Sequence, residues 1–126
     1  MSVENKWSIL FIKQDNSKFD AETKVFNTAF KRVDRVLGRE EALEFFQNNS
    51  YDIVISDLSV EPEELAFLKQ IQDIKEGQCI FAMVDPKDED KLYSIADLGI
   101  NAFELIPEHF DQALEQIALF DPYEEQ

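Results

Sequence analysis

The sequence is poor in the residues that build disulfide frameworks, histidine-rich metal sites and phosphate-binding glycine loops. Its 126 residues include one cysteine, Cys79, one histidine, His109, and three glycines. A single cysteine excludes an internal disulfide and a multi-cysteine zinc site, and a single histidine argues against a histidine-based metal site. Three glycines do not assemble a dinucleotide-binding fingerprint. Because the sequence also shows no nucleophilic triad and no paired-carboxylate hydrolase arrangement, we expect a protein that is not an enzyme.

Basic residues are also scarce. The chain has 12 Lys and Arg against 27 Asp and Glu, and its formal net charge is −15. This charge argues against nucleic acid and anionic membrane as direct partners, because both surfaces would repel it. A basic protein partner stays open, and so does the simpler interpretation that the charge keeps the protein soluble. The polar amino terminus and the short apolar run after it predict neither a signal peptide nor a membrane span, so we expect a cytoplasmic protein.

The most informative stretch is 51–58, Tyr-Asp-Ile-Val-Ile-Ser-Asp-Leu. A short apolar run rich in β-branched residues, set between polar flanks, is typical of a strand covered by helices on both faces. Such a strand lies at the centre of a parallel sheet. Its carboxyl end, where open α/β sheets place their ligands and reactions, would carry Asp57.

Apolar segments of strand length alternate with amphipathic segments along the whole chain. We expect strands at 7–12, 34–38, 51–58, 78–84 and 100–106, and helices between 18 and 33, 40 and 48, 62 and 74, 88 and 98, and 108 and 118. Asp15, Asn16 or Ser17 would cap the first helix. Right-handed crossovers then predict an α/β fold, a doubly wound five-stranded parallel sheet in the order 2-1-3-4-5, which is a flavodoxin-like three-layer sandwich. We expect one domain over 1–126, with a core of about 7–120 and a polar tail at 121–126.

In this strand order, the carboxyl ends of the first, third and fourth strands meet at one edge of the sheet. The residues that these strands bring to the edge are Lys13, Gln14, Asp15, Asp57, Val84 and Asp85.

At this point the chain resembles the receiver domain of two-component response regulators, of the chemotaxis-regulator type. The resemblance rests on the segment around Asp57 and on 38–43, 67–71 and 98–103, and it covers 7–120. In that family the acid that ends the third strand accepts a phosphoryl group from a histidine kinase. This acid and an acidic pair after the first strand hold Mg²⁺. A hydroxyl residue ends the fourth strand, and a lysine precedes a proline after the fifth.

The resemblance implies that Asp57 is the phosphoacceptor, but the residues around it depart from the family pattern. The acidic pair falls on Lys13 and Gln14, the hydroxyl position on Val84, and the lysine position on Ile106, with Pro107 kept. The loop after Asp57 departs as well. Because electrostatic stabilisation is the main contribution of such a site, these losses predict a receiver that does not phosphorylate efficiently. We therefore expect no cofactor. The alternative is Mg²⁺ held by Asp15 and Asp57.

Two further features follow from the resemblance. Phe103 falls on the aromatic switch position of the family, although a core phenylalanine that never moves is the simpler interpretation. Ile106-Pro107 matches a peptide bond that is often cis in the family.

The leading hypothesis is a degenerate receiver, or pseudo-receiver, that serves bacterial two-component signal transduction as a protein-interaction module independent of phosphorylation. The alternative is a working phosphoacceptor that a histidine kinase phosphorylates on Asp57. In receivers the commonest contact face combines the fourth helix, fifth strand and fifth helix. Here this face would bind a protein partner or a second copy of the chain. It would include Lys91, Tyr93, Ser94, Asp97, Phe103 and the helix after Pro107.

The role of Asp57 itself is left with two hypotheses. In the first hypothesis, Lys13 reaches across the edge and pairs with Asp57, because an acid at a semi-buried sheet edge usually finds a partner. Otherwise Asp57 persists in solvent among Asp15 and Asp85, where repulsion between like charges would raise its proton affinity.

Overall fold

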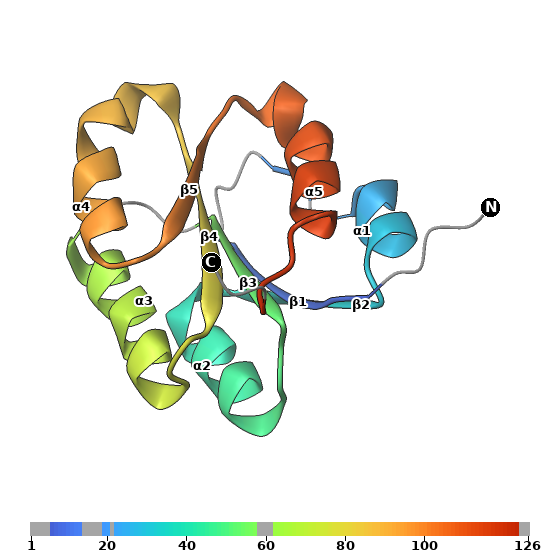
Figure 1. Cartoon of the computed structure of the whole chain (residues 1–126), viewed down its shortest axis with the longest axis horizontal. Helices are drawn as coiled ribbons and strands as arrows, with labels where there is room; N and C mark the ends of the chain where they lie inside the picture. Colours follow the sequence, from blue (N-terminus) through green and yellow to red (C-terminus); the bar gives the residue numbers. More distant parts are fainter. Residues whose placement is uncertain (1–5, 14–18, 21, 58–61, 124–126) are drawn as a thin grey trace.

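The fold is built on one five-stranded parallel sheet (Figure 1). The structure is a computed structural model, and it describes residues 6–13, 19–20, 22–57 and 62–123. The strands are β1 (Ser8–Lys13), β2 (Arg32–Leu37), β3 (Ile53–Asp57), β4 (Cys79–Val84) and β5 (Asn101–Glu104). They are hydrogen-bonded in the order β2-β1-β3-β4-β5, and every adjacent pair is parallel. The strand order predicted from the sequence is confirmed.

Helices cover both faces of this sheet, which gives three layers (Figure 1). The α-helices are α1 (Lys24–Ala29), α2 (Gly38–Asn48), α3 (Pro62–Ile74), α4 (Leu92–Asp97) and α5 (Phe110–Ala118), and the 3-10 helices are η1 (Pro86–Lys91) and η2 (Pro107–His109). α1 and α5 pack on one face, and α2, α3 and α4 pack on the other. The hydroxyl of Thr23 donates to Oδ1 of Asp111 at 2.6 Å, which ties the start of α1 to α5.

Each face of the sheet has its own hydrophobic core, because successive side chains of a strand point to opposite faces. In β1, Leu10 and Ile12 belong to the core under α2, α3 and α4, whereas Ile9 and Phe11 belong to the core under α1 and α5. All four side chains are fully buried. A strand that is buried on both faces has no solvent-facing position, and this is why β1, β3 and β4 read as continuous apolar runs.

The first helix is much shorter than the sequence pattern predicts. α1 has six residues, and the side chain of Thr23 accepts a hydrogen bond from the N–H of Val25 at its start. The chain is already extended at Phe30, and Val33 lies in β2. The prediction was wrong because Phe30 and Val33 pack into the same core as the helix but from extended backbone, so their spacing imitates helical periodicity. The expected caps at 15–17 lie outside the described residues.

The segment after β4 also differs from the single helix expected at 88–98. The carboxylate of Asp85 accepts from the N–H of Lys87 at 2.9 Å and starts η1, and the non-helical backbone of Asp88 separates η1 from a true α-helix. α4 therefore begins only at Leu92. β5 ends at Glu104 rather than at Ile106, and β2 begins at Arg32 rather than at Asp34.

Candidate functional site

The carboxyl ends of β1 and β3 bring Lys13 and Asp57 side by side. The two residues are Cα partners in the parallel register of these strands, and both are half-buried. Each is the last residue of its strand, so both stand where the apolar interior of the sheet meets the loops. Asp57 is thus at the position that the sequence predicts for it, and the neighbour that β1 supplies is a cation.

The end of β4 contributes a buried apolar side chain and a carboxylate that accepts a backbone hydrogen bond. Val84 is only 1% exposed and belongs to the core under α2, α3 and α4. Asp85, the next residue, caps η1. A carboxylate that accepts a backbone N–H at a helix start is stabilised there by the helix itself. Val84 thus has no polar atom in its side chain, and the carboxylate of Asp85 is already engaged by the backbone of η1.

The end of β5 carries the remaining positions of the predicted site. The N–H of Leu105 donates to the carbonyl of Val84 at 3.0 Å, which extends the β4–β5 pairing by one residue. Ile106 follows with 42% of its surface exposed, and Pro107 opens η2. No cis peptide bond occurs among the described residues, so the cis bond expected between Ile106 and Pro107 is wrong.

Phe103, at the aromatic switch position, lies half-buried in β5. Its ring packs on Phe81 of β4 with 5.6 Å between the centroids, and the centroid of the Phe120 ring lies 5.2 Å from that of Phe81. Phe103 therefore adds to the core under α1 and α5.

Gln14 and Asp15 lie outside the described residues. Among the residues that the structure does describe, no group of three or more His, Cys, Asp or Glu side chains is arranged to hold a metal ion. Mg²⁺ in proteins is usually bound through one or two carboxylates. In the described part of this edge, Asp57 has Lys13 as its Cα partner and the Asp85 carboxylate caps η1.

At the opposite end of β3 the structure shows a contact that the sequence did not reveal. The hydroxyl of Tyr123 donates to Oδ1 of Asp52 at 2.5 Å, and its ring lies 5.8 Å from that of Trp7. The N–H of Ser8 donates to Oδ2 of the same carboxylate at 2.8 Å. The hydrogen bond to Asp52, aided by burial, raises the pKa of Tyr123 to about 12. Tyr123, expected to be part of a polar tail, thus contacts residues just before β1 and β3. An aromatic residue in an otherwise polar segment was the available signal.

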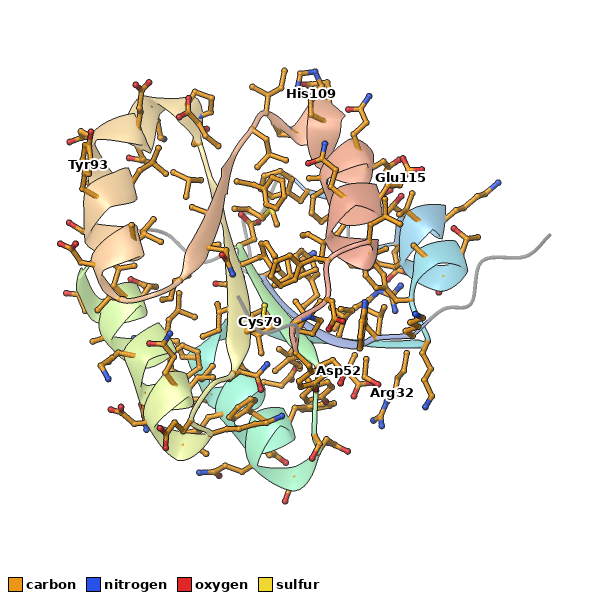
Figure 2. All side chains as sticks on the ribbon, viewed as in Figure 1. Arg32, Asp52, Cys79, Tyr93, His109 and Glu115 are labelled. Atoms are coloured by element: carbon orange, nitrogen blue, oxygen red, sulfur yellow. The ribbon has the colours of Figure 1, made fainter. Side chains whose placement is uncertain are left out.

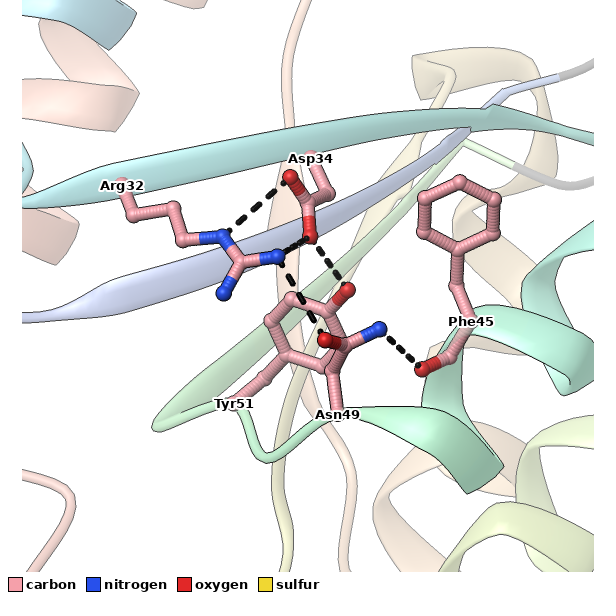
Figure 3. Close-up of polar contacts among 5 residues, drawn as sticks. All are labelled: Arg32, Asp34, Phe45, Asn49 and Tyr51. Atoms are coloured by element: carbon pink, nitrogen blue, oxygen red, sulfur yellow. Dashed lines mark hydrogen bonds and ion pairs between the residues drawn. The ribbon is translucent and has the colours of Figure 1, made fainter.

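A second polar cluster closes the β2 edge (Figure 3). Asp34 accepts from the hydroxyl of Tyr51 at 2.5 Å and from Nη2 of Arg32 at 2.7 Å. Asn49 lies beside them and donates to the carbonyl of Phe45 at 3.1 Å. Burial of Tyr51, together with Asp34, raises the pKa of its hydroxyl well above its ordinary value. In Figure 2, Asp52 and Arg32 lie toward one end of the molecule and His109 toward the other.

The described helices include none that is long and apolar enough to cross a membrane. The molecule is a flavodoxin-like, doubly wound α/β domain with Asp57 at the carboxyl end of its central strand.

Comparison with known proteins agrees with this class at the level of fold. No family model and no curated protein matches the sequence. Among solved structures, the chain is similar to the crystal structure of a response regulator receiver domain protein from Clostridium thermocellum, with a TM-score of 0.66 and 18% sequence identity. The match covers 89% of this chain and 94% of that one. A likeness at this level of identity shows a shared fold.

Proposed function

We propose that the chain is a degenerate receiver that acts in bacterial two-component signal transduction as a protein-interaction module, without phosphorylation and without a cofactor. Its role is to present a surface to a partner, and it catalyses no reaction of its own. The observation that carries this proposal is the β1–β3 register, which makes Lys13 the Cα partner of Asp57. A lysine there takes the place that the family gives to a carboxylate ligand of the metal.

The electrostatics of this edge oppose phosphoryl transfer in two ways. Lys13 repels a divalent cation from the position next to Asp57, and Val84 offers no hydroxyl to bind a phosphoryl oxygen. Phosphoryl transfer depends on positioning and on charge stabilisation by the metal and by cationic or hydrogen-bonding side chains. Losing one such group commonly costs on the order of a hundred- to thousandfold in rate, so the loss of several leaves little activity.

The alternative function is a working phosphoacceptor, phosphorylated on Asp57 by a histidine kinase. It is favoured by one observation, the half-buried carboxylate at the carboxyl end of the central strand. In this case Asp15 would supply the metal affinity and Mg²⁺ would be required.

The test is a titration with magnesium and beryllofluoride, a mimic of the acyl phosphate, followed by amide chemical shifts around Asp57. We expect no saturable shifts at millimolar magnesium. Saturating shifts in the wild type that vanish in the Asp57→Asn variant would instead establish the phosphoacceptor. Light scattering on the same sample reports whether the free protein is a monomer or a homodimer.

An attraction between Lys13 and Asp57 makes a separate, smaller prediction. The Lys13→Ala variant should lose about 1 kcal/mol of unfolding free energy, because an ion pair at a half-buried site is screened less than one at the surface. The matched control is Lys31→Ala, which removes an exposed lysine. Equal melting temperatures for the wild type and Lys13→Ala would sink the pairing.

The partner would bind the face formed by α4, β5 and α5. Tyr93 projects from α4 with 83% of its surface exposed (Figure 2), and Ser94 and Asp97 are exposed on the same helix. An exposed aromatic residue supplies large contact area at low entropic cost, which is why tyrosine is enriched in interfaces.

A further inference from the structure

A cavity lies at the amino-terminal ends of β4 and β5, at the end of the sheet opposite to Asp57. The last turns of α3, the turns at Gly77 and Gly99, and the segment after α5 surround it, and its volume is about 440 Å³. Phe120 and Pro122 give it an apolar wall, and most of the other lining side chains are polar. Cavities of this size and mixed character hold small organic molecules.

Gln78, which lines this cavity, has a buried acceptor without a donor. Only 6% of the residue is exposed, and its Nε2 donates to the carbonyls of Cys79 at 3.1 Å and of Asp52 at 3.4 Å. These two carbonyls fix the orientation of the amide, because the reverse orientation would set oxygen against oxygen. Oε1 of Gln78 then has no hydrogen-bond partner among the described residues. An unsatisfied buried acceptor is costly, so a ligand that brings a donor gains a favourable bond.

Asn101, also in the lining, presents its amide in the same way. Its Nδ2 donates to the carbonyl of Ile80 at 3.3 Å and lies 3.8 Å from Sγ of Cys79. Burial raises the pKa of the Cys79 thiol to about 11, so this side chain is neutral near pH 7. The donors of both amides are thus engaged by the protein, and their oxygens are left for a ligand.

Glu76 supplies the net charge of the cavity. The lining also includes Lys69 and Asp73, which pair with each other at 2.8 Å. Lys75, the neighbour of Glu76 in sequence, donates to the carbonyl of Tyr51 at 3.1 Å. Within the described part of the chain, Glu76 therefore forms no ion pair. Acceptor oxygens next to an uncompensated carboxylate favour a ligand that is positively charged and rich in donors.

We propose that this cavity binds a small organic ammonium ion. Its three N–H groups donate to Oε1 of Gln78, Oδ1 of Asn101 and the carboxylate of Glu76, and its hydrocarbon part lies against Phe120 and Pro122. The terminal torsion of a glutamine amide is soft, so a small turn of Gln78 presents its oxygen to the ligand. The proposal goes beyond the proposed function, because it concerns a ligand site at the other end of the sheet from Asp57.

A divalent metal ion is a poorer occupant of this cavity. Its lining holds two carboxylates, and that of Asp73 is already paired with Lys69. Ca²⁺ takes six to eight oxygen ligands, and Mg²⁺ demands near-ideal octahedral geometry. An ammonium group needs only the few acceptors that the cavity provides.

The fluorescence of Trp7 reports on the cavity through contacts already described. Gln78 donates to the carbonyl of Asp52, and the carboxylate of Asp52 accepts from Tyr123. The ring of Tyr123 lies 5.8 Å from that of Trp7, and Pro122, which precedes Tyr123, lines the cavity. Because Trp7 is the only tryptophan of the sequence, its emission is unambiguous.

The experiment titrates the whole chain with pentylammonium and, as controls of similar length, with pentanol and pentanoate. By NMR we expect saturable shifts of the side-chain amide resonances of Gln78 and Asn101 with pentylammonium, and a change in Trp7 emission at the same concentrations. Pentanol lacks the charge and should bind about tenfold more weakly, and pentanoate should not bind. The affinity for pentylammonium should fall with increasing salt.

Two nearly isosteric substitutions change the charge of the lining in opposite directions. Glu76→Gln removes the carboxylate and should weaken binding of pentylammonium about tenfold. Gln72→Glu adds a carboxylate at a half-buried position of the lining and should strengthen binding about threefold, a gain that a merely structural role would not produce. The matched control Glu44→Gln removes an exposed acid of α2 and should leave the affinity within about twofold.

Three results would overturn the proposal. The first is equal binding of pentylammonium and pentanol, which would show an apolar site that does not recognise charge. The second is shifts of surface amides without those of Gln78 and Asn101. The third is the same affinity for the wild type, Glu76→Gln and Gln72→Glu. None of these measurements uses magnesium, beryllofluoride or a protein partner, so failure here is distinguishable from failure of the pseudo-receiver proposal.

Discussion

The two edge strands of the sheet, β2 and β5, differ in the exposure and the polar contacts of the residues around them. At the β2 edge, a polar network of Arg32, Asp34 and Tyr51 covers the strand, and Tyr51 is only 1% exposed. At the β5 edge, the strand has four residues and three of them are exposed. Within the described residues, the side-chain hydrogen bonds of β5 are those of Asn101, which donates to Sγ of Cys79 and to the carbonyl of Ile80.

An unpaired edge strand presents free backbone groups, and proteins protect it by shortening it, charging it or covering it. β2 is long and is covered by charged and polar side chains that are already engaged with one another. β5 is short, and three of its four residues are exposed. The difference separates an edge whose polar side chains are engaged from an edge that is mostly exposed, and mutations at the two edges should differ accordingly.

The largest expected effect is the loss of an aromatic side chain at the covered edge. Tyr51→Ala should cost about 3–5 kcal/mol of unfolding free energy, because it empties a fully buried position in the core. Phe103→Ala at the β5 edge should cost about 1–2 kcal/mol, since its ring is only half-buried. Denaturant unfolding of both variants measures the difference. Equal losses would mean that the two edges contribute alike.

A smaller effect comes from the hydroxyl of Tyr51. Tyr51→Phe removes one of the donors to Asp34 and should cost about 1–2 kcal/mol at neutral pH. The control is Tyr93→Phe, at an exposed tyrosine, which should change nothing measurable.

The same pair of variants makes a prediction about alkaline pH. The pKa of Tyr51 is higher in the folded protein than the ordinary value of about 10. Above that ordinary value the unfolded chain loses its proton first, so stability falls as pH rises further. Tyr51→Phe should reduce this fall, and Tyr93→Phe should leave it intact. An unchanged alkaline slope in Tyr51→Phe would contradict the assignment.

The smallest effect concerns Tyr123, which is 60% exposed. Tyr123→Phe should cost about 0.5–1 kcal/mol by removing the hydrogen bond to Asp52. In spectrophotometric titration, Tyr123 should ionise near its raised pKa of about 12. Asp52→Asn should lower that pKa toward 10, because the negative charge that opposes ionisation is gone. If Asp52→Asn left the titration unchanged, the contact would not persist in solution.

The success of the sequence prediction varied with the kind of element. β1, β3 and β4 were predicted correctly because strands buried on both faces are continuous apolar runs. α1 was predicted too long because Val33 of β2 continues the helical spacing by coincidence, and a spacing does not say whether the backbone is helical or extended. η1 was missed because the capping carboxylate of Asp85 acts two residues away, within a segment that reads as an ordinary acidic helix start.

At the candidate site, the sequence predicted which residues stand at the carboxyl edge but not which of them are engaged in local hydrogen bonds. Lys13 and Asp57 were placed there by strand ends alone, and the register confirms that they are neighbours. The engagement of Asp85 with η1 was not predictable from residue types, since a carboxylate at such a position also suits a metal or solvent.

By itself, the amino-acid sequence determined the alternation of strands and helices and the position of Asp57 at the end of the central strand, because apolar segments and residue identities are local properties. Only the tertiary structure decided which polar side chains meet. Tyr123 and Asp52 are 71 residues apart, and Thr23 and Asp111 are 88 apart. Hydrogen bonds of this kind depend on the distance and direction between two side chains, and these are fixed only when the helices and strands have packed.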